Sequence, residues 1–176
     1  MLLLENTNIW DVLDDGAIGI PTNGFIKRNG DGVMGAGLAK EAMTRFPGIS
    51  YELGSHLKKN GNVVGWLLTQ PQILAIPVKP VSIKINTQSD FKYILSRVKN
   101  NYSIGSTVPG FHCKASISLI EQSLIQLIDF IDKYRLNKVY IPLLGCGHGG
   151  LSYSNDLFPL LSKLEIPDSI TLVTPV

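Results

Sequence analysis

The sequence predicts an α/β domain in which helices cover a β-sheet, and three observations support this fold class. Segments with the apolar spacing of a strand alternate along the chain with segments that have the apolar spacing of a helix, as is typical of layered α/β structure. The 176 residues suit one domain around one core. A hydrophobic content of 44% and a charged content of 17% are those of an ordinary globular protein. We therefore expect a single domain over residues 1–176.

The expected elements follow one another along the chain. The first helix should stop at Pro47 and the second at Asn60-Gly61, because proline and glycine terminate helices. Ser118 and Glu121 form a capping-box pattern at the start of the third helix, and Ser154 is the expected cap of the last one. The expected strands are 2–4, 17–21, 63–69, 73–78, 138–143 and 170–173, and the expected helices are about 38–46, 50–59, 118–134 and 157–164.

Residues 80–113 interrupt this order with a polar stretch in which regular spacing is lost. We interpret it as an insertion that leaves the core, with one short helix near residues 90–99. Irregular segments of this length are usually functional or mobile, so a lid over a site and a variable surface insertion both fit the pattern.

Composition excludes several classes of protein. No run of about 18 apolar residues is present, so no membrane span is expected. Cys113 and Cys146 are the only cysteines, which favours a reducing, cytoplasmic location over a disulfide framework. Neither cysteine has a histidine at the spacing of a zinc ligand pair, so neither a metal nor another cofactor is expected. A formal net charge of +2 does not by itself indicate nucleic-acid binding.

The first motif of interest is a glycine-rich loop at Gly30–Gly37, between a buried strand and an amphipathic helix. Glycines at 30, 32, 35 and 37 allow main-chain N–H groups to approach phosphate oxygens, and a helix N-terminus adds unpaired donors. Ordinary turn glycines in a flexible loop are the alternative. The stretch Gly30–Gly35 also fits the dinucleotide fingerprint G-x-G-x-x-G. Eight residues separate it from its strand and a helix stands where the acidic residue should follow, which argues against a dinucleotide site.

A second glycine-rich loop, Gly145–Gly150, again follows a buried strand. In an α/β sheet, loops at the carboxyl ends of neighbouring strands line one crevice, where ligands usually bind. Two such loops could hold a diphosphate from both sides.

The order of these motifs resembles that of macrodomains. Asn23 precedes Gly32-Val-Met-Gly-Ala-Gly-Leu-Ala39, then come Phe46-Pro-Gly48 and Leu144-Gly-Cys-Gly-His-Gly-Gly-Leu151. Within that superfamily the chain is similar to the terminal ADP-ribose glycohydrolases, a branch that includes antitoxins which remove ADP-ribose from DNA. The resemblance covers nearly the whole chain except the insertion at 80–113. It implies a three-layer α/β/α sandwich with a mixed, mostly parallel sheet.

The resemblance also implies that ADP-ribose lies in a crevice with its diphosphate between the two loops. Asn23 would face the distal ribose. Asn8-Ile9 stand where many macrodomains have Asp-Ile beside the adenine, and Asn8 departs from that pattern. The residues implied to bind the ligand are Asn8, Ile9, Thr22, Asn23, Gly32, Val33, Met34, Gly35, Ala36, Gly37, Leu144, Gly145, Cys146, Gly147, His148, Gly149, Gly150 and Leu151.

Lys79 is the first candidate for catalysis. Ile76-Pro-Val-Lys79 ends a strand and resembles the Pro-x-Lys motif whose lysine is catalytic in this branch. An amine beside a ribosyl anomeric carbon can attack it or stabilise the departing charge, and desolvation would lower its pKa. Some members carry an acid at the position of Gly149, where this chain has glycine. His148, Asp31 or the lysine acting alone must then take the catalytic role of that acid. His148 can equally be a ring that covers the ligand.

These features predict a hydrolase that removes ADP-ribose from a modified macromolecule, DNA or protein. A phosphatase acting on ADP-ribose 1″-phosphate and a non-catalytic module that binds ADP-ribose or a nucleotide signal are the alternatives. The basic residues Lys27, Arg28, Lys40 and Lys84 fit either a nucleic-acid backbone or a solvated surface. The insertion separates the lysine from the next helix, so this chain could accept a different macromolecule from its relatives.

Overall fold

The computed structural model describes residues 2–175 and contains a six-stranded sheet of order β1-β8-β7-β2-β4-β3. Neighbouring strands are parallel except β3, which pairs antiparallel with β4 across a turn at Gln70 and Pro71. The sheet is therefore mixed and mostly parallel, as predicted. Its strands are β1 (Leu2–Leu4), β2 (Ala17–Asn23), β3 (Gly65–Thr69), β4 (Gln72–Lys79), β7 (Val139–Pro142) and β8 (Ile170–Val173).

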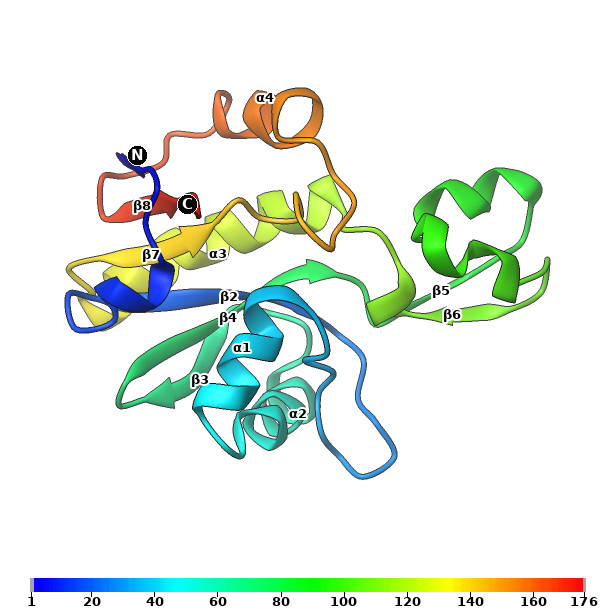
Figure 1. Ribbon diagram of the computed structural model, residues 1–176, viewed down its shortest axis with the longest axis horizontal. Coiled ribbons are helices and arrows are strands. Elements are labelled where there is room, and N and C mark those ends of the chain that lie inside the picture. Colours follow the sequence, from blue (N-terminus) through cyan, green and yellow to red (C-terminus); the bar gives the residue numbers. More distant parts are fainter. Residues whose placement is uncertain (1, 176) are drawn as a thin grey trace.

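Helices cover both faces of the sheet and produce three layers (Figure 1). Successive side chains of a strand point to opposite faces, so β4 contributes to two cores. Ile73 and Ala75 pack with α1 and α2, whereas Leu74 and Ile76 pack with α3 and α4. The helices are α1 (Gly37–Arg45), α2 (Ile49–Asn60), α3 (Ile117–Tyr134) and α4 (Phe158–Leu161).

The termini of α1 and α2 agree with the sequence signals. α1 ends at Arg45, two residues before Pro47, and α2 ends at Asn60 with Gly61 in the left-handed region at φ 83°. β3 begins two residues later than predicted, at Gly65. Local signals were sufficient here because proline and glycine act through the backbone itself.

The predicted caps of the last two helices were wrong. α3 is capped by Ser116, whose hydroxyl accepts from Leu119 N, because Ser116 N is fixed on Val78 O and the helix starts directly after it. Ser152, not Ser154, caps the π-helical turn η5 (Tyr153–Leu157), and α4 follows as a single turn. No helix within residues 2–175 combines the length and hydrophobicity that a membrane span requires.

The segment between β4 and α3 projects from the main sheet, at the right-hand side of Figure 1. It contains an unpredicted antiparallel pair, β5 (Ser82–Lys84) and β6 (Thr107–Pro109). The single helix expected near 90–99 was wrong, because the buried extended pair Ile94-Leu95 divides it into two 3₁₀ helices, η2 (Gln88–Tyr93) and η3 (Ser96–Asn101). The segment ends in η4 (Gly110–His112) and has a small core of its own, formed by Ile85, Ile94, Val108 and Cys113. We call residues 80–113 the excursion.

Gly54 of α2 lies directly against the loop at residues 30–37, and a side chain at this position is expected to destabilise the protein. A Cβ there would overlap the carbonyl group of Gly30 and lie 2.9 Å from Gly32 N. Helix propensity would favour Gly54→Ala by about 1 kcal/mol, whereas overpacking typically costs about 1–3 kcal/mol. We expect a net fall of about 1 kcal/mol in the free energy of unfolding, measured with urea.

Gly35→Ala is the matched control, because its Cβ would meet nothing within 4 Å. A Gly54→Ala variant more stable than Gly35→Ala would show that the loop moves away from α2 without cost, because only the gain in helix propensity would then remain.

Candidate functional site

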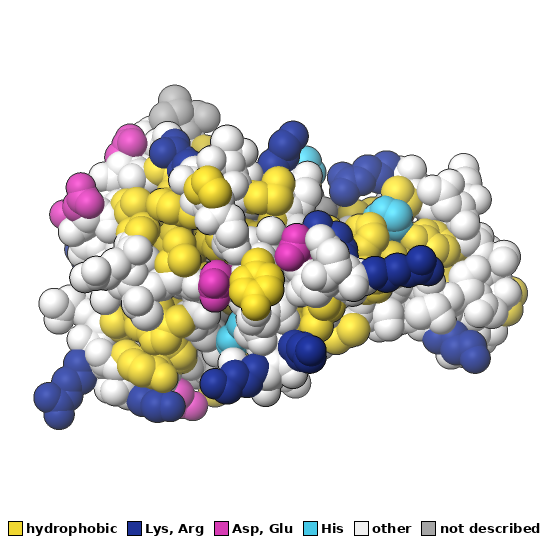
Figure 2. Space-filling view, turned by 90° about the horizontal axis from the view of Figure 1, so that it is seen from below, with side chains coloured by type: hydrophobic (Ala, Val, Ile, Leu, Met, Phe, Trp, Pro, Cys, Tyr) yellow, Lys and Arg dark blue, Asp and Glu magenta, His cyan; other side chains and the backbone are white. Residues whose placement is uncertain are grey.

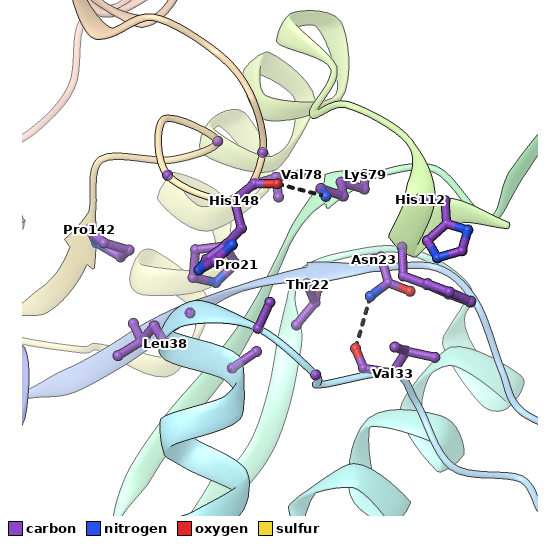
Figure 3. Close-up of a pocket in the computed structure, with 18 of the residues that line it drawn as sticks. Pro21, Thr22, Asn23, Val33, Leu38, Val78, Lys79, His112, Pro142 and His148 are labelled. Carbon is purple, nitrogen blue, oxygen red and sulfur yellow. Dashed lines mark hydrogen bonds between the residues drawn. The ribbon is translucent and has the colours of Figure 1, made fainter. Parts of the chain in front are cut away.

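A cavity of about 320 Å³ lies where three central strands end. The ends of β2, β4 and β7 contribute Thr22 and Asn23, Lys79, and Pro142 respectively. The first loop, Gly30–Gly37, and the second loop, Gly145–Gly150, approach the same cavity from opposite sides, and the excursion closes its outer end (Figure 3). Both predicted loops therefore meet in one place. Of the residues with an expected role, Thr22, Asn23, Val33, Gly35–Gly37, Lys79, Gly145 and Gly147–Gly149 line the cavity.

The first loop is held in place by Asn23. Its amide nitrogen donates to Val33 O at 2.8 Å, and its oxygen accepts from Phe25 N at 3.1 Å. Beyond Val33 the chain is left with free donors, since the N–H groups of Gly35 and Ala36 donate to no group within residues 2–175. Ala36 is also the N-cap of α1 and offers no side-chain cap. The helix therefore begins with unsatisfied amides, which is the arrangement that attracts an anion.

The second loop is tied to the start of α3. Gly149 O accepts from Ala115 N at 2.8 Å, and Gly145 O accepts from Leu151 N at 3.0 Å. Gly145 has φ 76°, so only glycine adopts this turn without strain. Across the described part of the chain, the N–H groups of Gly147, His148 and Gly149 have no acceptor.

The two loops come into contact across the cavity. A Cβ on Gly37, where φ is 54°, would lie only 3.1 Å from Cδ2 of His148. Any side chain at Gly37 would narrow the space between the loops. Free amides from two loops therefore converge on the same small volume.

Lys79 ends β4 and reaches across the mouth of the cavity. Its Nζ donates to His148 O at 3.2 Å, and its carbonyl accepts from Asn62 Nδ2 at 3.0 Å (Figure 3 shows the first of these contacts). Burial, followed by the neighbouring Arg97 guanidinium, lowers the pKa of Lys79 to about 8, against a small opposing effect of Cys113. The amine is therefore far easier to deprotonate than an ordinary lysine.

Asp31, a catalytic candidate, does not line the cavity. Its carboxylate accepts from Asn29 Nδ2 and lies 3.9 Å from Lys27 Nζ, at the outer tip of the first loop. Asn8 and Ile9, expected beside the adenine, also lie outside it. The Asn8 side chain caps the short helix η1 (Ile9–Val12) by accepting from Trp10 N, and Ile9 is buried in the core beneath α1.

The other loop residues form the support of the cavity rather than its surface. Met34 and Leu144 are buried in the cores on either face of the sheet. Gly32 packs directly on Leu53 of α2. The remaining expected contacts, Cys146, Gly150 and Leu151, do not line the cavity. Burial, and to a lesser degree Asp156, raise the pKa of the Cys146 thiol.

Sequence reasoning missed Arg97, Phe111 and His112, which the excursion places on the cavity wall. The irregular pattern of the excursion carried no signal of their direction. The charged and imidazole side chains of the wall are those of Lys79, Arg97, His112 and His148. No Asp or Glu among the described residues lines it. Within residues 2–175 no group of three or more His, Cys, Asp or Glu side chains is arranged to hold a metal ion.

Fold and cavity together define the class of protein: the chain has the fold of a macrodomain. Among solved structures it resembles the macrodomain of Mycobacterium tuberculosis DarG, with 18% identity over 99% of each chain and a TM-score of 0.62. The macrodomain of Thermus aquaticus DarG is 18% identical over 99% of this chain and 98% of that chain, with a TM-score of 0.63.

A third solved structure is Thermosipho africanus DarTG in complex with ADP-ribose, 22% identical over 92% of this chain and 38% of that chain, with a TM-score of 0.56. No family model matches the sequence, and no curated protein matches it. The likeness therefore shows the fold, and it confirms the α/β sandwich predicted from the sequence.

Thr22 offers a test of the cavity wall. Its Oγ1 is buried and has no hydrogen-bond partner among the described residues. An unpaired buried hydroxyl costs about 1–3 kcal/mol, so we expect Thr22→Val to raise the free energy of unfolding by about 1 kcal/mol in the absence of ligand, measured by urea denaturation.

Thr171→Val on β8 is the matched variant, because Thr171 Oγ1 is equally unpaired but does not line the cavity. If Thr22→Val is destabilising and Thr171→Val is not, an ordered water already forms a hydrogen bond with the Thr22 hydroxyl.

Proposed function

We propose that this protein binds ADP-ribose in the cavity and hydrolyses its bond to a modified macromolecule. One observation carries the proposal: residues of both loops whose main-chain amides have no acceptor line the same cavity as Lys79. Amides are suited to a diphosphate because they donate to its oxygens and bring no negative charge with them. The Thermosipho africanus DarTG structure, which holds ADP-ribose, supports the same choice of ligand.

The diphosphate would lie between the N-terminus of α1 and the second loop. Gly35 and Ala36 would donate from one side, and Gly147–Gly149 from the other. The exposed His148 ring lies against Gly37, so it is placed to cover the ligand. Thr22 Oγ1, unpaired in the wall, would gain a partner on binding.

Lys79 is the group that we propose to act on the distal ribose. In the neutral form, Nζ attacks the anomeric carbon as the bond from that carbon to the macromolecule breaks, and the proton lost by the amine goes to the departing group. Water then cleaves the carbon–nitrogen bond, leaving free ADP-ribose and the regenerated lysine. With a pKa of about 8, roughly a tenth of the amine is neutral at pH 7.

Replacing Lys79 should remove catalysis and leave binding in place. We expect Lys79→Ala to reduce release of ADP-ribose from ADP-ribosylated protein or oligonucleotide by about 100-fold or more, because the nucleophile is lost. ADP-ribose should still raise the Tm of the variant, since binding to the native state stabilises it. Time-resolved chromatography of released ADP-ribose and a thermal shift measure the two quantities.

Lys84→Ala serves as the control, because Lys84 is an exposed lysine of β5 outside the cavity wall. Undiminished release by Lys79→Ala would refute the catalytic role. A Tm unaffected by ADP-ribose in the wild-type protein would refute the ligand.

The pH dependence of the wild-type rate tests the protonation state of Lys79. The lone pair is available only after deprotonation, so the rate should rise about tenfold per pH unit below the pKa and level off above about 8. Initial rates between pH 5.5 and about 9.5 give the profile. A rate that falls through pH 8 would assign the reaction to the ammonium form instead.

A further inference from the structure

The outer end of the cavity is built by the excursion, and its construction is specific. Arg97 projects from η3, and Phe111 and His112 come from η4. Tyr102 Oη forms a hydrogen bond with Nδ1 of His112 at 2.5 Å, and the Phe111 ring packs edge-on against Phe25 at 5.2 Å between centroids. The small core of the excursion fixes these elements relative to one another.

This end of the cavity carries positive charge without a partner. Within residues 2–175, the Arg97 side chain forms neither an ion pair nor a hydrogen bond. It is close enough to Lys79 and His112 to lower the pKa of both, in each case as the second cause after burial. The lowered pKa of His112 favours its neutral ring. Because Tyr102 engages Nδ1, Nε2 is the ring nitrogen left for a ligand. Lys79 and Arg97 repel each other, and no carboxylate in the wall compensates for their charge. Binding of an anion would therefore be favourable here.

The excursion as a whole also carries a net positive charge. It holds Lys84, Lys92, Arg97 and Lys99 against Asp90 alone, so the net positive charge of the chain resides in this segment. In Figure 2 the Asp and Glu side chains of the visible face lie over the main part of the molecule, and the excursion at the right shows Lys and Arg. An anionic ligand is therefore attracted to this end before contact.

We propose that Arg97 and His112 form a second anion subsite, which binds a phosphate group carried beyond the distal ribose of ADP-ribose. The proposal rests on the function proposed above, because it places the distal ribose between Lys79 and this subsite. A guanidinium fork can donate two parallel hydrogen bonds to one phosphate, and His112 Nε2 can donate a third. Tyr102 is a positioning residue, since it acts by orienting His112.

The phosphate can come from two sources with the same chemistry. One is a phosphomonoester on the ribose itself, as in ADP-ribose 1″-phosphate. The other is a backbone phosphate next to an ADP-ribosylated base. A neutral amino-acid side chain as acceptor would leave the subsite empty.

Arg97→Gln tests the subsite, and Lys99→Gln is its matched control, because Lys99 belongs to the same 3₁₀ helix and carries the same charge but does not line the cavity. Stopped-flow displacement of a fluorescent ADP-ribose analogue reads binding before turnover. The three ligands are ADP-ribose, ADP-ribose 1″-phosphate and an ADP-ribosylated trinucleotide. We expect Arg97→Gln to weaken binding of at least one phosphate-bearing ligand about tenfold, the effect of a charged hydrogen bond. Binding of ADP-ribose should change less than about twofold, as should all binding to Lys99→Gln.

The pattern of losses identifies the source. A loss with the 1″-phosphate alone indicates the monoester, and a loss with the trinucleotide alone indicates a strand phosphate. Equal effects of Arg97→Gln and Lys99→Gln, or equal weakening of all three ligands by Arg97→Gln, would overturn the subsite while leaving the proposed function intact. If the wild-type protein binds none of the three ligands, the proposed function fails and the subsite fails with it.

Tyr102→Phe separates orientation from charge. It removes the hydroxyl that holds Nδ1 of His112 and keeps every charge in the cavity. We expect a several-fold loss for the same phosphate-bearing ligand and none for ADP-ribose. Identical affinities in Tyr102→Phe and wild type would remove His112 from the subsite.

Discussion

Parallel pairing of β2 with β4 on one side and with β7 on the other is the constraint on which the site depends. Parallel neighbours end at the same edge of a sheet, so Asn23, Lys79 and Pro142 arrive together although they are distant in the sequence. Main-chain hydrogen bonds and the two apolar cores maintain this pairing, so it does not depend on the polar residues at the strand ends. Function is thus added at strand ends whose positions the core has already set.

Under the proposed function, the cavity would bind an anion mainly through backbone donors. Amides of two loops supply donors on its inner sides, and side chains with positive charge or an imidazole stand at its outer end. The two kinds of donor respond differently to conditions. Main-chain amides do not titrate, so their ability to donate hydrogen bonds does not change with pH. Lys79 and His112 do titrate, and burial and Arg97 lower the pKa of both. Binding at the inner part of the cavity is therefore expected to be independent of pH, and binding at the outer part is expected to change with pH.

Much of the fold could be predicted from the sequence because its signals are local or periodic. Pro47 and Gly61 limit helices through backbone chemistry, and the buried strands stand out as apolar runs. Both glycine-rich loops were found because they follow such strands. The start of α3 was mispredicted because a tertiary contact decides it: Ser116 is held by β4 and caps the helix in place of Ser118. The role expected for Asn8 came from the resemblance, whereas a local hydrogen bond to Trp10 N makes Asn8 a helix cap. Arg97 and His112 could not be found, since their direction depends on how the excursion folds over its own small core.

The contact between Gly37 and His148 joins an early part of the chain to a late one. Such a junction closes only after β7 has entered the sheet, so a growing or truncated polypeptide would hold the first loop without its counterpart. Closing a long loop costs entropy before any contact compensates for it. Under the proposed function, binding of the ligand would therefore require the late second loop as well as the early first loop, and an incomplete chain that lacks the second loop would not retain the ligand.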